Sequence, residues 1–169
     1  LNQLNVERRQ VETQMKQDAL TALAQFKLEL SETPAALILF EPHWHQGVIG
    51  IVAGRLKEQF HRPAIVFAAD EDGEHIKGSA RSIEGIHIRD AIETVAEQFP
   101  HLVSHFGGHA AAAGLTIKKQ HFEEFKQHFV QLIQGMDEAL FQATLWTDGI
   151  LPTEALNLDT VHFLQNLTP

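Results

Sequence analysis

The run of residues 106–114, FGGHAAAAG, has the composition of a phosphate-binding segment. Two adjacent glycines, Gly107 and Gly108, let backbone N–H groups approach an anion closely, and the small residues after them leave space for a ligand. His109 adds a side-chain donor for a phosphate oxygen. A Gly-Gly pair alone more often marks a tight turn into a close-packed element. We therefore predict a phosphate contact at these three residues only in combination with two further segments.

A second segment, KGSARS at residues 77–82, combines a guanidinium with hydroxyl groups. The guanidinium of Arg81 matches two phosphate oxygens in one plane, and the hydroxyls of Ser79 and Ser82 add donors. The glycine and the alanine between them are expected to keep the surface open. A half-exposed edge strand with Arg81 in an ordinary salt bridge explains the same letters. Both interpretations stay open from this segment alone.

A third segment, HWHQGVIG at residues 43–50, precedes an expected helix. Because helix N-termini favour anions, we expect His45 and nearby N–H groups to contact a phosphate. Two histidines in one loop also suggest zinc, but no cysteine accompanies them and the eleven histidines are scattered. We therefore expect no metal site in this chain. A serine hydrolase is disfavoured as well, because no nucleophile-elbow pattern surrounds a serine.

Hydrophobic periodicity predicts the elements that position these segments. Apolar residues at helical spacing predict helices over 1–30, 48–60, 88–99 and 122–133. Short apolar runs predict buried strands over 35–40, 64–69, 76–82 and 115–117, with an acidic turn around Gly73 between the second and third. This alternation predicts an α/β domain over residues 31–135.

The chain changes character after Met136. Residues 141–146 are expected to form a strand, followed by a turn at Asp148-Gly149. The last residues complete no unit, which suggests a second domain that is truncated. Because the first residue is Leu1 and no leader sequence follows it, we interpret the start as a cut inside a longer protein.

Composition limits the possible functions. The chain has 169 residues, of which 44% are apolar, so it can bury a core. No apolar run approaches the roughly 20 residues that cross a bilayer, and the absence of cysteine agrees with a cytoplasmic protein. A formal charge of -9 argues against bulk attraction to nucleic acid. Six cations nevertheless gather in the middle of the chain: Arg55, Lys57, Arg62, Lys77, Arg81 and Arg89.

The motifs together resemble the RecJ family of single-strand-specific DNA exonucleases. In the order of that family they are WHQGVIGIVA at 44–53, Arg55-Leu56, His61-Arg62-Pro63, KGSARS at 77–82, and FGGH at 106–109 with AAG at 112–114. Gly-Gly-His alone is shared with other DHH-family phosphoesterases and with the C-terminal domain of alanyl-tRNA synthetase. The segment at 44–53 narrows the resemblance to RecJ. Ala80 stands where many relatives have glycine.

The resemblance implies a three-part organisation. Residues 1–30 correspond to a connector helix, and residues 31–135 to a DHH-associated domain with a mixed central sheet flanked by helices. Residues 136–169 correspond to the start of an OB-fold region, which is expected to be β-rich and truncated.

The resemblance also implies the substrate-binding lobe of a 5′-to-3′ exonuclease used in DNA repair and recombination. Two Mn²⁺ or Mg²⁺ ions would be held by an N-terminal DHH lobe of the same protein, so this chain alone is expected to bind neither ion and to be inactive. Its partners would be single-stranded DNA and the DHH lobe, with a helicase and a single-strand-binding protein as further candidates and no membrane. The residues expected to contact nucleotide phosphates are Arg81, His109, Gly107, Gly108, Ser79, Ser82 and His45.

Two alternatives stay open. A DHH-type phosphodiesterase for short oligonucleotides or cyclic dinucleotides would use the same Gly-Gly-His segment. A tRNA-binding module like that of alanyl-tRNA synthetase would also use it, although the segment at 44–53 argues against this function.

Overall fold

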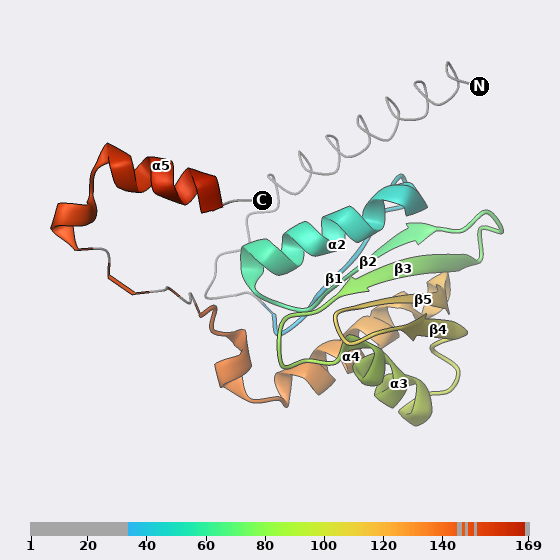
Figure 1. Cartoon of the computed structure of the whole chain (residues 1–169). Helices are drawn as coiled ribbons and strands as arrows, with labels where there is room; N and C mark the ends of the chain where they lie inside the picture. The colour runs from blue at the N-terminus through green and yellow to red at the C-terminus, as the bar shows by residue number, and fades with distance from the viewer. Residues whose placement is uncertain (1–33, 145–146, 148, 151, 168–169) are drawn as a thin grey trace, which may run out of the picture.

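One mixed five-stranded sheet forms the centre of the protein (Figure 1). The computed structural model describes residues 34–144, 147, 149–150 and 152–167, and the helix expected over 1–30 lies outside them. The strands occur in the order β1-β2-β3-β5-β4, and β1 and β2 form the parallel pair. Their bounds are β1 Leu37–Phe40, β2 Ala64–Ala69, β3 His75–Arg81, β4 His105–Gly108 and β5 Ala112–Lys118.

Helices cover both faces of this sheet (Figure 1). Helix α2 (Gln46–Phe60) connects the parallel strands and packs on one face, as a crossover between parallel strands requires. Helices α3 (Ile88–Gln98) and α4 (Phe122–Gln134) pack on the other face. The predicted α/β architecture with a mixed sheet flanked by helices is therefore confirmed.

The core is divided by the sheet into two apolar clusters. On the α2 side, Val52, Ala53 and Leu56 of the helix pack against buried side chains of β1 and β2 such as Val66. The cluster on the other side contains large aromatic rings. The rings of Phe67 and Phe125 pack edge to face, with their centroids 5.9 Å apart. Burial of this much apolar surface supplies the main stabilisation of the domain.

Strands β3 and β5 bury one face each. Their alternating pattern places Ile76 and Ala80 of β3, and Leu115 and Ile117 of β5, in the cluster under α3 and α4. Successive side chains of a strand point to opposite faces. The residues between them therefore face the α2 side, where no described element covers the exposed residues Gly107 and Gly114.

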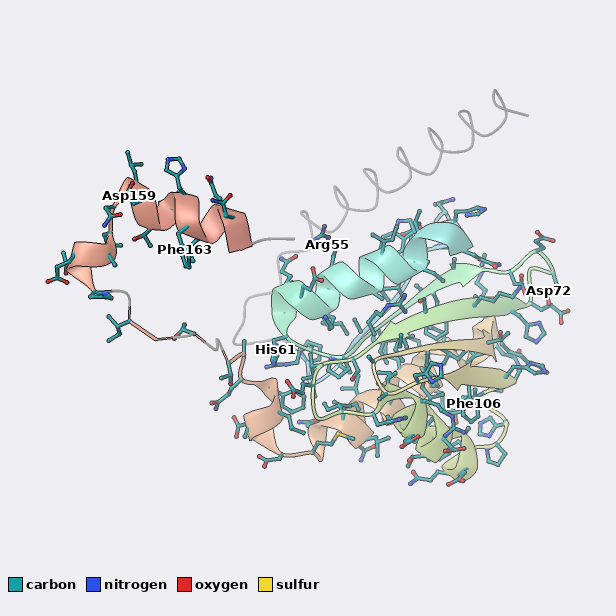
Figure 2. All side chains as sticks on the ribbon, viewed as in Figure 1. Arg55, His61, Asp72, Phe106, Asp159 and Phe163 are labelled. Atoms are coloured by element: carbon teal, nitrogen blue, oxygen red, sulfur yellow. The ribbon has the colours of Figure 1, made fainter. Side chains whose placement is uncertain are left out.

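The acidic turn between β2 and β3 is present as predicted, with Gly73 at φ 72°. Asp72 organises it, because its Oδ1 accepts hydrogen bonds from the backbone N–H groups of Glu74 and His75, both at 2.9 Å. Its Oδ2 lies 2.6 Å from Nδ1 of His75. The backbone donor of His75, followed by the His75 ring, lowers the pKa of Asp72 to about 2. Figure 2 labels Asp72 at the end of this hairpin.

Two strand predictions need correction. Residues 105–108 form strand β4, which was not predicted, and β5 begins at Ala112 instead of 115. Pairing explains both differences, since Gly107 pairs with Gly114 and Gly108 with Ala113. Glycine has a low strand propensity, and the cross-strand partners override it here.

The prediction of a strand over 141–146 is wrong for residues 141–144, the part of this range that the structure describes. Phe141 ends a 3₁₀ helix, η3 (Glu138–Phe141), and residues 142–144 belong to no strand. The side chain of Asp137 caps η3 by accepting from the N–H of Ala139, and the guanidinium of Arg62 donates to the carbonyl of Phe141 at 2.8 Å. These contacts hold a helical turn against the domain.

The described residues beyond 141 carry no strand. They include a 3₁₀ helix at Thr153–Ala155 and helix α5 at Leu158–Leu167. The β-rich character expected after 136 is therefore not found in this part, and the assignment of residues 136–169 to an OB-fold region stays a prediction. No helix in the described ranges is long and apolar enough to cross a membrane.

Candidate phosphate-binding surface

Strand pairing brings the two central segments of the sequence together. Ser79 of β3 pairs with Gly114 of β5, and Gly114 pairs with Gly107 of β4. Arg81 pairs with Ala112 one step further along. Directly paired residues direct their side chains to the same face of a sheet. We call this surface, made by Ser79, Arg81, Ala112, Gly114 and Gly107, the open face.

The glycines of the open face leave its surface low. A Cβ atom added at Gly107 would meet no atom within 4 Å, and one added at Gly114 would meet only a backbone oxygen at 3.8 Å. Packing inside the protein therefore does not require glycine at these two positions. Close approach of a ligand to the backbone would require it.

Gly108 has a different reason to be glycine. Its φ is 144°, and an added Cβ would lie 2.5 Å from the carbonyl oxygen of Ala112. Side chains rarely adopt that φ, so this position serves the β4–β5 hairpin.

Arg81 is the side chain best placed to bind an anion on the open face. Its Nη1 donates to Oγ of Ser79 at 3.0 Å and to the carbonyl oxygen of Ala80 at 2.8 Å. No carboxylate among the described residues pairs with it, so the salt bridge considered from the sequence is not found there. A guanidinium has five N–H donors, and the two bonds leave donors for a ligand.

Four of the other five cations in the middle of the chain also have protein partners. Arg55 pairs with Glu58, and Arg62 donates to backbone carbonyls. Lys77 lies 3.0 Å from a carboxylate oxygen of Asp70, whose pKa it lowers. Arg89 forms a bidentate salt bridge with Glu93, in which Nη1 and Nη2 donate to the carboxylate oxygens at 2.9 and 2.8 Å. This carboxylate raises the pKa of Arg89.

Helix α2 lies close above the open face at Gly50. A Cβ added to Gly50 would lie 3.0 Å from Nη2 of Arg81 and 3.1 Å from Oγ of Ser79. The missing side chain thus lets the helix approach this pair. The site predicted from the sequence did not include Gly50 or Gly114. A glycine inside the expected helix was a signal of close packing at Gly50, but only the strand register shows which residues lie opposite it.

His109 lies exposed at the tip of the β4–β5 hairpin. The carbonyls of the two alanines after it accept backbone hydrogen bonds from Ser82 and Ile88, each at 3.0 Å, and the N–H of His109 donates to Ala112 at 2.7 Å. These bonds tie the hairpin tip to the start of α3. Within the described chain the imidazole itself makes no hydrogen bond, so a ring N–H is available to a ligand.

His45 caps the N-terminus of α2. Its Nδ1 accepts from the N–H of Gly47 at 3.0 Å. An accepting Nδ1 places the proton of a neutral imidazole on Nε2, which can then donate to an anion. The expected position at a helix N-terminus is observed, but no described contact joins His45 to Arg81 or Ser79. A phosphate contact at His45 stays a prediction.

Ser82 is separated from the other site residues. It follows β3, only 7% of its surface is exposed, and its Oγ is buried without a partner in the described part of the chain. It lines a pocket of about 530 Å³ with apolar neighbours such as Ile86 and Ala111. Its predicted phosphate contact is not tested directly, and the burial of the hydroxyl weighs against it.

Gly78 and Ala80 correct another expectation. Both are buried on the face under α3 and α4, so they do not keep the anion-binding surface open. An added Cβ at Gly78 would lie 2.6 Å from the ring of Phe67 and 2.7 Å from Leu115. The methyl group of Ala80 likewise belongs to the core and does not narrow the open face.

Sequence comparison gives a consistent family. The DHHA1 domain family matches residues 13–135. Relatives named single-stranded-DNA-specific exonuclease RecJ include the proteins of Haemophilus influenzae, 44% identical over 168 residues, and Escherichia coli, 39% identical over 170 residues. These matches cover 99% and 100% of this chain. The chain spans 29% of the length of each of these relatives.

Solved structures share the fold. RecJ from Thermus thermophilus in complex with Mg²⁺ matches 81% of this chain with a TM-score of 0.60 and 29% identity, over 20% of its own length. A structure of exonuclease RecJ bound to manganese matches 84% with a TM-score of 0.61 and 27% identity, over 32% of its own length. The sheet and its flanking helices are therefore an arrangement found in these proteins.

Proposed function

The chain belongs to the DHHA1 domain family, and from this membership we propose that it is the substrate-binding lobe of a 5′-to-3′ single-stranded DNA exonuclease of the RecJ type. The observation that carries the proposal is the geometry of Arg81. Its guanidinium lies beside the Ser79 hydroxyl and has no carboxylate partner in the described part, next to the Cβ-free positions Gly107 and Gly114. Cationic and hydroxyl donors above a low backbone surface are suited to a sugar–phosphate chain.

The side chains and glycines of the open face, together with His109, have distinct tasks in this proposal. Arg81 donates two N–H groups to one phosphate, and its bond to Ser79 orients the guanidinium. Gly107 and Gly114 let the strand lie close to the sheet, where Arg81 can reach it. His109, on a hairpin tip held by backbone hydrogen bonds, donates to a second phosphate. These contacts hold the scissile bond in place for a reaction whose catalytic groups belong to the DHH lobe.

Chemistry is assigned to a DHH lobe of the same nuclease. That lobe would hold the Mn²⁺ or Mg²⁺ ions, which supply an activated water and stabilise the charge on the phosphate. The described residues of the open face offer guanidinium, hydroxyl and imidazole groups but no cluster of carboxylates, the ligands that these ions prefer. The ions therefore do not fit on this surface, and the residues here serve by positioning substrate.

The cellular setting follows from the same proposal. We assign the nuclease to DNA repair and recombination in the cytoplasm. A helicase that supplies single strands and a single-strand-binding protein that covers them are the partners such a reaction needs.

Replacement of Arg81 by alanine tests the binding surface. We expect the affinity for a 5′-phosphorylated, 3′-labelled single strand to fall about tenfold or more, because a charge-assisted hydrogen bond is lost. The slope of log affinity against log salt should fall by about one. Fluorescence anisotropy at several salt concentrations measures both quantities.

Arg55→Ala is the matched control. Arg55 is an exposed arginine on α2 that pairs with Glu58, and it is labelled in Figure 2. The Arg55→Ala variant should bind the single strand with the affinity of the unchanged chain. Equal affinity of the Arg81 and Arg55 variants would remove the open face as the binding site. If the 169-residue chain binds too weakly to measure, the same two variants are compared by KM in the full-length nuclease. Selective binding of tRNA, or hydrolysis of dinucleotides only, would favour one of the alternatives.

A further inference from the structure

Three potential metal ligands converge at the end of the domain away from Arg81. His101 lies between α3 and β4, His121 ends the 3₁₀ helix η2 (Lys119–His121), and Glu124 lies in the first turn of α4. One ligand atom from each lies within 4.8 Å of the others. We call these three residues the histidine–glutamate cluster. The cluster is separate from the open face, because His75 and Lys118 pair at this end of β3 and β5 and Arg81 and Ala112 at the opposite end.

The ligand atoms of the cluster are almost as close to one another as the ligand atoms around a bound ion. Nε2 of His101 lies 3.1 Å from Oε1 of Glu124, and the rings of His101 and His121 are 5.3 Å apart. Ligand atoms at the usual zinc distances in a tetrahedron are roughly 3.4 Å apart. Hence no pair in the cluster has to close by more than about 1.4 Å, which small side-chain rotations supply.

A buried nitrogen of His121 is a second indication that the cluster binds an ion. Its Nδ1 is buried and has no hydrogen-bond partner among the described residues, whereas its Nε2 lies 2.9 Å from the side-chain amide nitrogen of Gln120. Buried polar atoms in proteins are nearly always satisfied. Coordination through Nδ1 would satisfy it and leave an Nε2–H donor. Rotation of the Gln120 amide would then place its oxygen as the acceptor, the outer hydrogen bond that metal-bound histidines usually make.

We propose that the histidine–glutamate cluster binds one divalent transition-metal ion, with Zn²⁺ as the best match. Two imidazoles and one carboxylate suit zinc, while Mg²⁺ and Mn²⁺ prefer oxygen ligands. His101 and Glu124 are exposed, so water can complete the coordination. The ion would tie the loop before β4 to the start of α4. It would stiffen this end of the domain and have no direct part in the binding of DNA.

Zinc binding by the complete 169-residue chain, freed of any affinity tag, tests the proposal. In competition with a chromophoric chelator, the metal-free chain should bind one Zn²⁺ with an affinity that His101→Ala and Glu124→Gln each lower tenfold or more. The second variant keeps the shape of the side chain. His43→Ala is the control, because His43 is exposed on another loop and its ring makes no described contact. Failure of the unchanged chain to compete for zinc, or equal affinity in all variants, would overturn the proposal.

Thermal unfolding provides an independent measurement. Zn²⁺ should raise the Tm of the unchanged chain and of His43→Ala by more than that of Glu124→Gln, and Mg²⁺ should raise none of them. Circular dichroism checks that the variants are folded. Single-stranded DNA affinity should be the same for Glu124→Gln and the unchanged chain. Loss of DNA binding in Arg81→Ala with zinc binding intact would show that the two sites are independent. An equal Tm shift in every variant would mean that zinc binds elsewhere.

Discussion

At the scale of single residues, the glycines divide into two kinds. Gly107 and Gly114 have open space where a side chain would be, whereas Gly108 is required by its φ of 144° and by the nearby Ala112 carbonyl. The same residue type thus leaves the surface open at one position and meets a backbone requirement at the next. Sequence letters alone do not separate these roles, because both depend on what lies above the strand.

Substitution of Gly107 and Gly108 by alanine should separate binding from stability. We expect Gly107→Ala to keep the free energy of unfolding but to weaken single-stranded DNA binding by roughly tenfold, about 1.4 kcal/mol, because the methyl group occupies the floor of the open face. Gly108→Ala should cost about 1–3 kcal/mol of stability through backbone strain. Urea unfolding and anisotropy measure the two effects. Unchanged DNA affinity in Gly107→Ala would contradict the assigned role of this surface.

Asp72 makes stability depend on pH. Its pKa is lowered to about 2, from a value of 3.8, mainly by the backbone N–H of His75 and then by the His75 ring. A carboxyl whose pKa is lower in the folded state stabilises the fold above pH 4 and loses this contribution as the pH falls from about 4 to 2. Asp72→Asn should therefore be less stable than the unchanged chain at pH 6 and nearly equal to it near pH 2.

Urea unfolding from pH 6 to pH 2 measures this difference. Glu71→Gln is the control, because the Glu71 side chain is exposed and makes no hydrogen bond in the described ranges. A constant difference between Asp72→Asn and the unchanged chain at all pH values would argue against a titrating carboxylate.

At the scale of elements, β3 serves two surfaces at once. Ser79 and Arg81 lie on the open face, while Gly78 and Ala80 face α3 and α4 in the core. Period-2 alternation makes this division unavoidable. A motif of six consecutive residues therefore contains both open-face and packing positions, and α2 approaches the open face at Gly50.

Gly78→Ala should destabilise the fold without altering the open face. The added methyl group would lie 2.6 Å from the Phe67 ring and 2.7 Å from Leu115, and such overpacking typically costs about 1–3 kcal/mol. Gly54→Ala on α2 is the control. Its added Cβ meets nothing within 4 Å, so helix propensity should stabilise it by about 0.5–1 kcal/mol. Equal stability of the two variants in urea would show that the packing around Phe67 is looser than observed.

At the scale of the whole molecule, the open face lies on one side of the sheet, while α3 and α4 pack on the other side (Figure 1). Figure 2 labels Arg55 on α2 and Phe106 on β4, the edge strand of the sheet. The guanidinium carbon of Arg89 lies 5.8 Å from the centroid of the Phe106 ring. Phe106 pairs with Leu115 and so faces α3 and α4 instead of a bound strand. Its aromatic ring is therefore not expected to stack on DNA bases.

A division of labour between two lobes predicts that this chain alone is not a nuclease. Incubation of the purified chain with Mn²⁺ and a 5′-phosphorylated single strand should release no nucleotides above a no-protein control. Gel analysis of end-labelled DNA measures the outcome. Mn²⁺-dependent digestion that survives exhaustive purification would place the catalytic ligands within these 169 residues and refute the division.

Local patterns were enough to identify much of this protein. Helical and alternating periodicity predicted α2, α3, α4, β1, β2 and β3 to within a few residues, since each pattern reflects which side of one element is buried. The order of the motifs identified the family, and the letters around Arg81 and His109 selected the segments now found side by side.

Long-range pairing decided the rest. Strand register made β4 from a glycine-rich run, placed Gly78 in the core, and aligned Ser79 with Gly114 and Gly107. Packing at the end of β3 buried the hydroxyl of Ser82, and folding gathered the histidine–glutamate cluster from three scattered positions. These features depend on contacts between residues far apart in the chain, which periodicity within one element does not encode.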